Sequence, residues 1–260
     1  MLEGFWLRKE YENKPIYIFF FGLIFTILAS LVSELIFPSY IGIISVFLVS
    51  LVGAYPMITY LRKKEAEEMK GKMCEEKLLK RHEDELVMYL SFFLGVTLGF
   101  VISSYFLPTG YFEIQEGVIL SIRGSITGNI LSNSFFQMII SNNIWVFFLT
   151  FLVSFLFSAG MIFILVWNAS VLGVFLARAS RNITHFHLLA VSYLPHGLLE
   201  IAAYILAGIS GALVSYQFDY YFIRKDKYDF DSVIRAIKDV MILITIGLVC
   251  LFLAGLIEVL

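Results

Sequence analysis

Residues 15–37 have the sequence PIYIFFFGLIFTILASLVSELIF, an apolar stretch that decides the fold class of this chain. Glu34 is the one charged residue among these 23 positions. An α-helix rises about 1.5 Å per residue, so about 20 apolar residues suffice to cross the roughly 30 Å of hydrocarbon in a bilayer. The stretch therefore predicts a helix that spans a membrane.

The composition of the whole chain leads to the same fold class. Of the 260 residues, 59% are apolar and 15% are charged, whereas a soluble domain keeps about 25% charged residues. The 19 Lys and Arg residues fall in five short regions, and long apolar stretches separate most of these regions. We therefore expect an all-α, polytopic transmembrane helical bundle in a lipid bilayer. The formal charge of −2 leaves no basic surplus for a nucleic-acid partner.

Six clear apolar stretches predict six membrane crossings. They are residues 15–37, 40–61, 86–107, 144–167, 195–216 and 240–260. The segment between the fourth and the fifth, residues 168–193, is too polar and too interrupted for one clean crossing. We expect a short or broken span at about Asn168–Ala179, which gives seven crossings. A re-entrant loop is the alternative, and it would place the next charged segment on the opposite side of the membrane.

The positions of Lys and Arg predict the orientation, because cytoplasmic loops carry an excess of basic residues. Residues 62–81 hold eight of them and residues 109–143 hold one. This contrast predicts a multi-pass protein of the cell membrane with a cytoplasmic N-terminus. Five basic residues at 224–238 favour a cytoplasmic position for that segment as well, and hence seven crossings.

The same pattern predicts three parts of the chain. Residues 1–61 are expected to form an N-terminal two-helix transmembrane hairpin. Residues 62–86 hold acidic and basic side chains four positions apart, a spacing that stabilises a solvated helix, and we expect a charged cytoplasmic helical linker there. Residues 87–260 are expected to form a membrane domain with an external loop at 108–143.

An acid lies deep in one predicted span, within the segment LPHGLLE at residues 194–200. Placing a charged carboxylate at the centre of a membrane helix costs at least about 2.5–3.5 kcal/mol, so Glu200 should be paired, protonated or in contact with water. His196 lies four positions earlier on the same helix face and is its expected partner. Asn168 and Ser170 could add polar contacts. These four residues are our candidate polar site in the membrane, either as a structural hydrogen-bonded pair or as a site that handles a solute or protons.

Three histidines upstream of this acid raise the question of a metal. His185, His187, His196 and Glu200 could together offer three imidazoles and a carboxylate. However, H-x-H followed by a distant H-x-x-x-E is not the signature of a zinc enzyme, and we expect neither a metal nor another cofactor. The chain also contains no nucleotide-binding loop, no H-E-x-x-H and no serine elbow. We assign no catalytic residue and do not expect an enzyme.

Glycines recur at spacings that favour close helix packing. Gly95 and Gly99 form the G-x-x-x-G pattern in FFLGVTLGF, and Gly208 and Gly211 lie in LAGISGALVS. Small residues at such spacing let helix backbones approach each other in lipid. We expect these glycines and Gly173 to pack helices within the chain, and a homodimer interface is the alternative.

The part of the chain from the third predicted span onward resembles the stage II sporulation protein M family of membrane proteins, in its archaeal form. The resemblance is carried by FFLGVTLGF, by the long apolar stretch at 141–174, by LPHGLLEIAAYILAGISGALVS and by the final LAGLIEVL. It implies a shared centre at residues 168–200, because these positions match the family pattern: Asn168, Gly173, His196, Gly197, Glu200, Gly208 and Gly211. In endospore-forming bacteria, the similar sporulation protein is a membrane scaffold for enzymes that degrade peptidoglycan.

Two functions compete on this basis. The family resemblance and the packing motifs favour a non-enzymatic membrane scaffold or assembly factor, whose partners would be the bilayer and other membrane or envelope proteins. The alternative is a transporter or channel for a small solute or ion, because irregular backbone and polar residues inside a membrane can line a path for a solute. His196 and Glu200 would then lie at the centre of that path.

Overall fold

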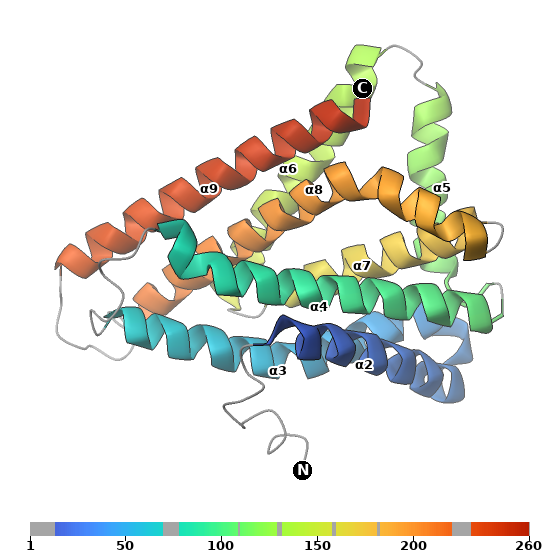
Figure 1. Cartoon of the computed structure of the whole chain (residues 1–260), viewed down its shortest axis with the longest axis horizontal. Coiled ribbons are helices and arrows are strands. Elements are labelled where there is room, and N and C mark those ends of the chain that lie inside the picture. Colours follow the sequence, from blue (N-terminus) through green and yellow to red (C-terminus); the bar gives the residue numbers. More distant parts are fainter. Residues whose placement is uncertain are drawn as a thin grey trace.

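The structure is a computed structural model that describes residues 14–69, 78–108, 110–128, 132–157, 160–180, 183–219 and 230–259. In these residues the chain forms eight α-helices and one short 3₁₀ helix, and no strand (Figure 1). The elements are α2 (Pro15–Ile36), η1 (Pro38–Tyr40), α3 (Ile41–Met69), α4 (Leu78–Phe106), α5 (Glu113–Gly128), α6 (Ser132–Leu156), α7 (Gly160–Ala179), α8 (Ile183–Phe218) and α9 (Phe230–Val259).

Seven of the described helices are long and apolar enough to cross a membrane. All the helices except α5 and η1 contain such a span, so the prediction of an all-α polytopic bundle with about seven crossings is confirmed. The protein is therefore a multi-pass membrane protein. The predicted external loop at 108–143 contains α5 and the beginning of α6.

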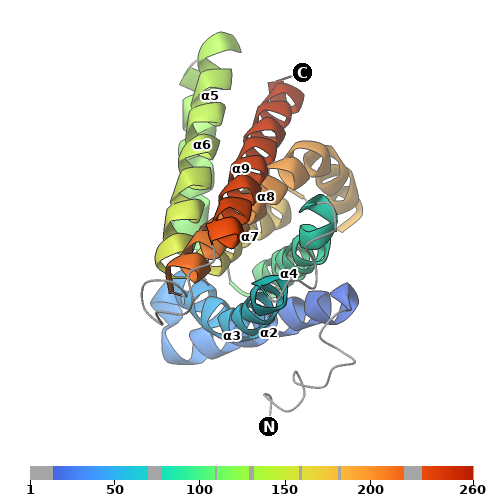
Figure 2. The ribbon, with the colours of Figure 1, turned by 90° about the vertical axis from the view of Figure 1, so that its left-hand side faces the viewer.

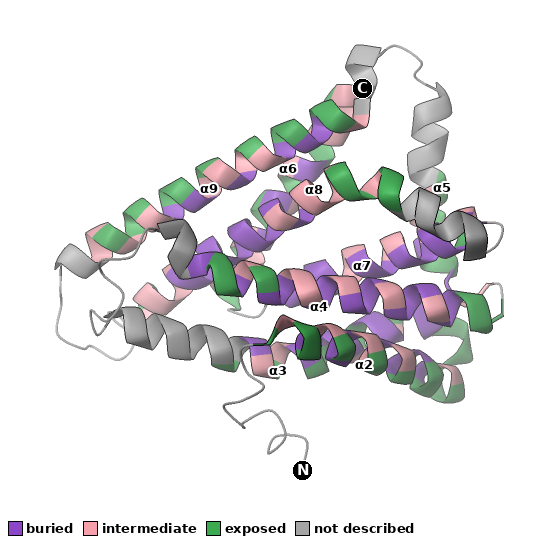
Figure 3. Cartoon of the chain, viewed as in Figure 1, coloured by how far each residue is buried: buried purple, intermediate pink, exposed green. Residues whose placement is uncertain are grey.

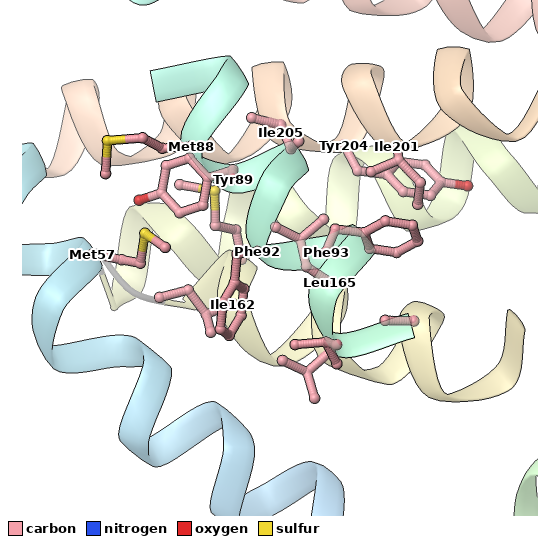
Figure 4. Close-up of a cluster of buried hydrophobic side chains, with 14 of the residues drawn as sticks. Met57, Met88, Tyr89, Phe92, Phe93, Ile162, Leu165, Ile201, Tyr204 and Ile205 are labelled. Atoms are coloured by element: carbon pink, nitrogen blue, oxygen red, sulfur yellow. The ribbon is translucent and has the colours of Figure 1, made fainter. Parts of the chain in front are cut away.

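The helices pack in three groups. Figure 2 shows α2 and α3 on one side of the molecule, α6 and α9 on the other, and α4, α7 and α8 between them, while α5 packs against α7 and α3. The buried residues concentrate on the central group (Figure 3). Figure 4 shows how α3, α4, α7 and α8 each supply side chains to this core: Met57, Met88, Tyr89, Phe92, Phe93, Ile162, Leu165, Ile201, Tyr204 and Ile205.

The boundary between the fourth and fifth spans differs from the prediction. The sequence predicted one span over 144–167 and a break near Asn168, but α6 ends at Leu156 and α7 begins at Gly160. The chain reverses there, and a Cβ on Gly160 would meet the backbone of Val153. A glycine therefore permits a turn so tight that hydropathy alone merges the two helices.

Consequently α7 is a full span of 20 residues that continues through Asn168. The side-chain amide of Asn168 donates to the carbonyl of Ile164 one turn earlier, at 2.8 Å. Because that amide is bonded to its own helix, it does not interrupt the helix. The short or broken span expected at Asn168–Ala179 is thus an ordinary crossing.

The helix predicted to begin at Pro195 instead begins at Ile183, and Pro195 lies inside α8. Proline lacks an N–H and its ring crowds the preceding turn, so it bends a helix. Figure 1 shows α8 as a bent ribbon. The part of α8 that precedes the proline is more polar than the part that follows, which is why the sequence did not indicate one continuous helix.

The predicted N-terminal hairpin is packed closely on the rest of the bundle. The backbone of α2 lies against the backbone of α4, because a Cβ on Gly95 would meet the carbonyl of Phe19 and one on Gly99 would meet Thr26. Glycine is matched on the other helix as well, where a Cβ on Gly22 would meet the Phe92 carbonyl. Both glycines of the G-x-x-x-G pattern are therefore covered within the chain.

Candidate functional site

The candidate site is a group of polar side chains on α6, α8 and α9. Glu200 lies on α8, five residues after Pro195 and directly before a stretch of α8 that is almost entirely buried. Its side chain is partly buried. The carboxylate therefore lies inside a span where water is scarce, and its partners decide whether it can remain there.

Asn143 on α6 is the hydrogen-bond donor to this acid. Its side-chain Nδ2 donates to Oε1 of Glu200 at 2.5 Å, and Asn143 itself is only 7% exposed. The hydroxyl of Tyr204, one turn further along α8, donates to Oδ1 of Asn143 at 3.1 Å. One amide on α6 thus binds two side chains that are four residues apart on α8. Hydrogen bonds between membrane helices are worth about 0.6 kcal/mol on average and up to about 1.7 kcal/mol.

Glu258 on α9 belongs to the same group. Its carboxylate interacts electrostatically with Glu200, with Tyr193 and with Tyr204. The sequence favoured a position of Glu258 at the headgroups, because it lies near the end of its predicted span. Like charges repel more strongly in the low dielectric of a membrane interior than in water.

His196 has a different neighbour from the one expected. Its ring packs on the ring of Tyr193, with the centroids 4.5 Å apart and an interplanar angle of 57°. Among the described residues, the hydrogen bond to Glu200 comes from Asn143 and none comes from His196. The imidazole lies on α8 near the polar group but contacts an aromatic ring.

Asn168 and Ser170 lie on α7 and take part in other contacts. The amide of Asn168 binds within its own helix, and the hydroxyl of Ser170 donates to the Trp167 carbonyl at 2.7 Å. Ser170 also accepts a long hydrogen bond of 3.4 Å from Nε2 of Gln115 on α5, a glutamine that is fully buried. Ser170 therefore links α7 to α5, and none of these hydrogen bonds involves Glu200.

Two of the four candidate metal ligands have side chains that the structure does not describe. The side chains of His185 and His187 are not described. Among the residues whose side chains are described, no three His, Cys, Asp or Glu residues are grouped so that they could hold a metal ion. Cys250, the free cysteine in this part of the chain, lies on α9.

The remaining predicted glycines lie at contacts between helices. A Cβ on Gly173 of α7 would meet Phe100 and the Thr97 carbonyl on α4. On α8, a Cβ on Gly208 would meet Met161 of α7, and one on Gly211 would meet the Phe151 carbonyl of α6. The α8 glycines thus lie on the helix that carries Glu200 and allow α6 and α7 to approach it.

Sequence reasoning missed two members of the polar group that carry signals in the sequence. Asn143 follows Asn142 inside a long apolar stretch, and two adjacent amides are as unusual there as an acid. Tyr204 lies four positions after Glu200, a spacing that places both on one helix face. Buried Gln115 has no such signal, because it lies in a segment where other polar residues, such as Glu113 and Glu116, are its neighbours.

Comparison with known proteins identifies the family. The model of the stage II sporulation protein M family matches residues 88–260. The chain belongs to this family. A curated relative, an uncharacterized protein of Methanocaldococcus jannaschii, is 29% identical over 124 residues, which are 48% of this chain and 68% of the relative. No solved structure matches the chain.

The family match confirms the resemblance deduced from the sequence and locates it in the fold. The sporulation protein M region includes most of α4 and all of α5 to α9, whereas α2 and α3 precede it. Asn143, Glu200, Tyr204 and Glu258 all lie inside the matched region. The candidate site therefore belongs to the part of the chain that defines the family.

Proposed function

We propose that this sporulation protein M family member is a non-enzymatic membrane scaffold or assembly factor that holds other membrane or envelope proteins in place. The observation that carries the proposal is the hydrogen-bonded chain from Tyr204 through Asn143 to Glu200. Asn143 uses its amide nitrogen and its amide oxygen for contacts between helices. Polar groups that are engaged in this way favour one fixed arrangement of α6 and α8, which suits a protein whose task is to present a surface.

A second feature supports this function at the end of the bundle where α4 and α7 finish. Nε of Arg178 on α7 forms an ion pair of 2.8 Å with Oε1 of Glu116 on α5, and Phe112 is fully buried directly before α5. The beginning of α5 is therefore fixed to the bundle. Its opposite face is exposed and includes Glu113, Ile114, Gly117 and Leu120. If the N-terminus is cytoplasmic, this face lies outside the cell and is available to envelope partners.

Site-specific photocrosslinking in native membranes tests the proposal. A photoreactive residue at Ile114 or Leu120 on the exposed face of α5 is expected to capture one companion protein. Purification in mild detergent should then recover that companion at a constant ratio to the chain. A photoreactive residue at Leu28, an exposed position on α2, is the matched control and should capture lipid. Recovery of the chain alone from every position would contradict a scaffold.

Transport of a proton or small cation is the second candidate, favoured by the interaction between Glu200 and Glu258 on neighbouring spans. Charged residues inside membrane spans are costly, and in transporters they mark ion and proton pathways. In that case the Asn143 amide would hold Glu200 in position while the pair of carboxylates binds and releases the cation.

Flux into sealed vesicles tests this second candidate. Purified chain is reconstituted, and proton or Na⁺ movement is followed after a pH or salt gradient is imposed. Glu200→Gln keeps a hydrogen-bond acceptor for Asn143 but removes the charge, so transport requires that it abolish flux. Glu34→Gln, near the end of α2, is the control and should leave flux unchanged. Absence of flux under every gradient, or equal flux in Glu200→Gln, excludes this candidate and leaves the scaffold.

A further inference from the structure

The outer face of α6 carries a regular stripe of exposed side chains. Exposed residues recur along it at alternating intervals of three and four positions: Asn142, Trp145, Leu149, Leu152 and Leu156. Alternation of three and four is the heptad spacing that lines one seam between two helices. Trp145 and Leu156 are 66% and 59% exposed, so the stripe has no partner among the described residues of this chain.

The opposite face of α6 packs against other helices of the bundle. Asn143, Phe147, Thr150 and Ser154 are buried, and they lie on the side where α6 contacts α8, α9 and α7. This packing fixes the rotation of α6, so the outer stripe must point away from the bundle. In the α6 span 22% of residues are buried, against 33% to 67% in the other six spans.

The stripe contains one polar side chain in an apolar setting. Nδ2 of Asn142 donates a long hydrogen bond of 3.4 Å to Oδ1 of Asn143. Its own Oδ1 and its second N–H remain available on the exposed face. Asn142 lies within the candidate membrane span of α6, six residues after its first residue, Phe136. An unpaired carboxamide inside a span is costly, and in membranes such groups bond across to another helix.

We propose that α6 pairs with α6 of a second copy of this chain through the stripe, with the two Asn142 amides hydrogen-bonded to each other. A carboxamide contains both a donor and an acceptor, so it is complementary to its own copy across a twofold axis. Two copies inserted in the same direction place their α6 helices parallel. A single Asn in the seam between two parallel helices also fixes their register.

The uncharged stripe supports a second copy over another kind of partner. It contains no acid or base that would need an opposite charge, and apolar surface alone does not drive helices together in lipid. The self-complementary amide of Asn142 is therefore the feature that favours a second copy of this chain as the partner of α6. The inference does not rest on the proposed function, because a scaffold and a transporter can both be dimers.

Cysteine crosslinking of the full chain in lipid vesicles tests the position of the interface. With Cys74→Ser and Cys250→Ala as background, a single Cys at position 149 or 152 is expected to form disulfide-linked dimers under a mild oxidant. The matched controls are a Cys at 148, exposed on α6 beside the stripe, and one at 252, exposed on α9. Crosslinking that is equal at the stripe and at the controls, or that is absent at both stripe positions, overturns the proposal.

The affinity of the pair tests the role of Asn142. Asn142→Leu should weaken dimerisation by roughly 5- to 30-fold, the factor that corresponds to one hydrogen bond between membrane helices in model peptides. Asn142→Gln keeps the carboxamide and should retain most of the affinity. Single-molecule photobleaching over a series of protein-to-lipid ratios measures both, and thermal unfolding checks that each variant is folded. An unchanged dimer in Asn142→Leu, or a monomer at every ratio, contradicts the proposal.

Discussion

The contact between α2 and α4 and the contact between α6 and α8 hold pairs of membrane helices together by different means. At the first, glycines on both helices bring the two backbones together, and a Cβ on Gly22 or Gly95 would meet a backbone carbonyl of the other helix. At the second, Asn143 on α6 connects Glu200 and Tyr204 on α8 by hydrogen bonds. Gly211 allows the close approach there as well.

The difference follows from the solvent. Lipid tails are as apolar as leucine, so burial of apolar surface does not drive membrane helices together, and close packing or hydrogen bonds must do so. Close packing at the glycines depends on the absence of side-chain atoms there. The contact at Asn143 depends on the presence of the hydrogen-bond donors and acceptors of Asn143, Glu200 and Tyr204. The first contact should therefore fail when atoms are added, and the second when they are removed.

The largest effect is expected from Gly95→Leu on α4. A Cβ at this position would already meet the carbonyl of Phe19 and approach the backbone N of Leu23, and backbone cannot move aside as a flexible side chain can. Overpacking typically costs 1–3 kcal/mol and occasionally more, so we expect a loss of about 3 kcal/mol or more. That loss corresponds to a Tm lower by roughly 10 °C in detergent.

Gly117→Leu on α5 is the matched control for this prediction. A Cβ there would have no heavy atom within 4 Å, and leucine has a higher helix propensity than glycine. Thermal unfolding in the same detergent should give a Tm that is unchanged or slightly raised. Equal losses in the two variants would mean that α2 and α4 are not held by backbone contact.

An intermediate effect is expected from Glu200→Leu. The change leaves the buried Nδ2 of Asn143 without its acceptor, and an unsatisfied buried donor costs about 1–3 kcal/mol. We expect a loss of about 2 kcal/mol and a Tm lower by several degrees. Glu200→Gln, whose amide oxygen still accepts from Asn143, should cost less than about 1 kcal/mol. If the leucine variant is as stable as the wild type, Asn143 does not need this acceptor.

These two contacts also differ in how far the sequence could predict them. The apolar stretches and their lengths were sufficient for the helical class and for six crossings, because crossing a bilayer sets a minimum length for each helix. The positions of Lys and Arg indicated the seventh. The pattern of Gly95 and Gly99 indicated close packing, but not which helix they contact. That choice depends on which faces meet in three dimensions, and no local spacing encodes it.

The polar group was predicted only in part for the same reason. Glu200 was found because an acid inside a span requires a partner, but its partner on α6 is 57 residues away in sequence. His196 was preferred because it is four residues away on the same helix. Local spacing favours such neighbours, and a bend at Pro195 changes which side chains of α8 face the other helices. The boundary at Gly160 was missed because hydropathy does not register a tight turn between two apolar helices.

The smallest effect is expected from Tyr204→Phe, which deletes one hydroxyl from the chain of hydrogen bonds. The loss should be near the average of about 0.6 kcal/mol for hydrogen bonds between membrane helices, because the ring remains packed in the core. A double-mutant cycle with Asn143→Leu sharpens the result, because the hydroxyl then has no amide to donate to. In that background Tyr204→Phe should be neutral, and the coupling energy equals the contribution of this one hydrogen bond. A cost that persists without Asn143 would show that the hydroxyl acts through another group, and the contact between α6 and α8 would then rest on Glu200 alone.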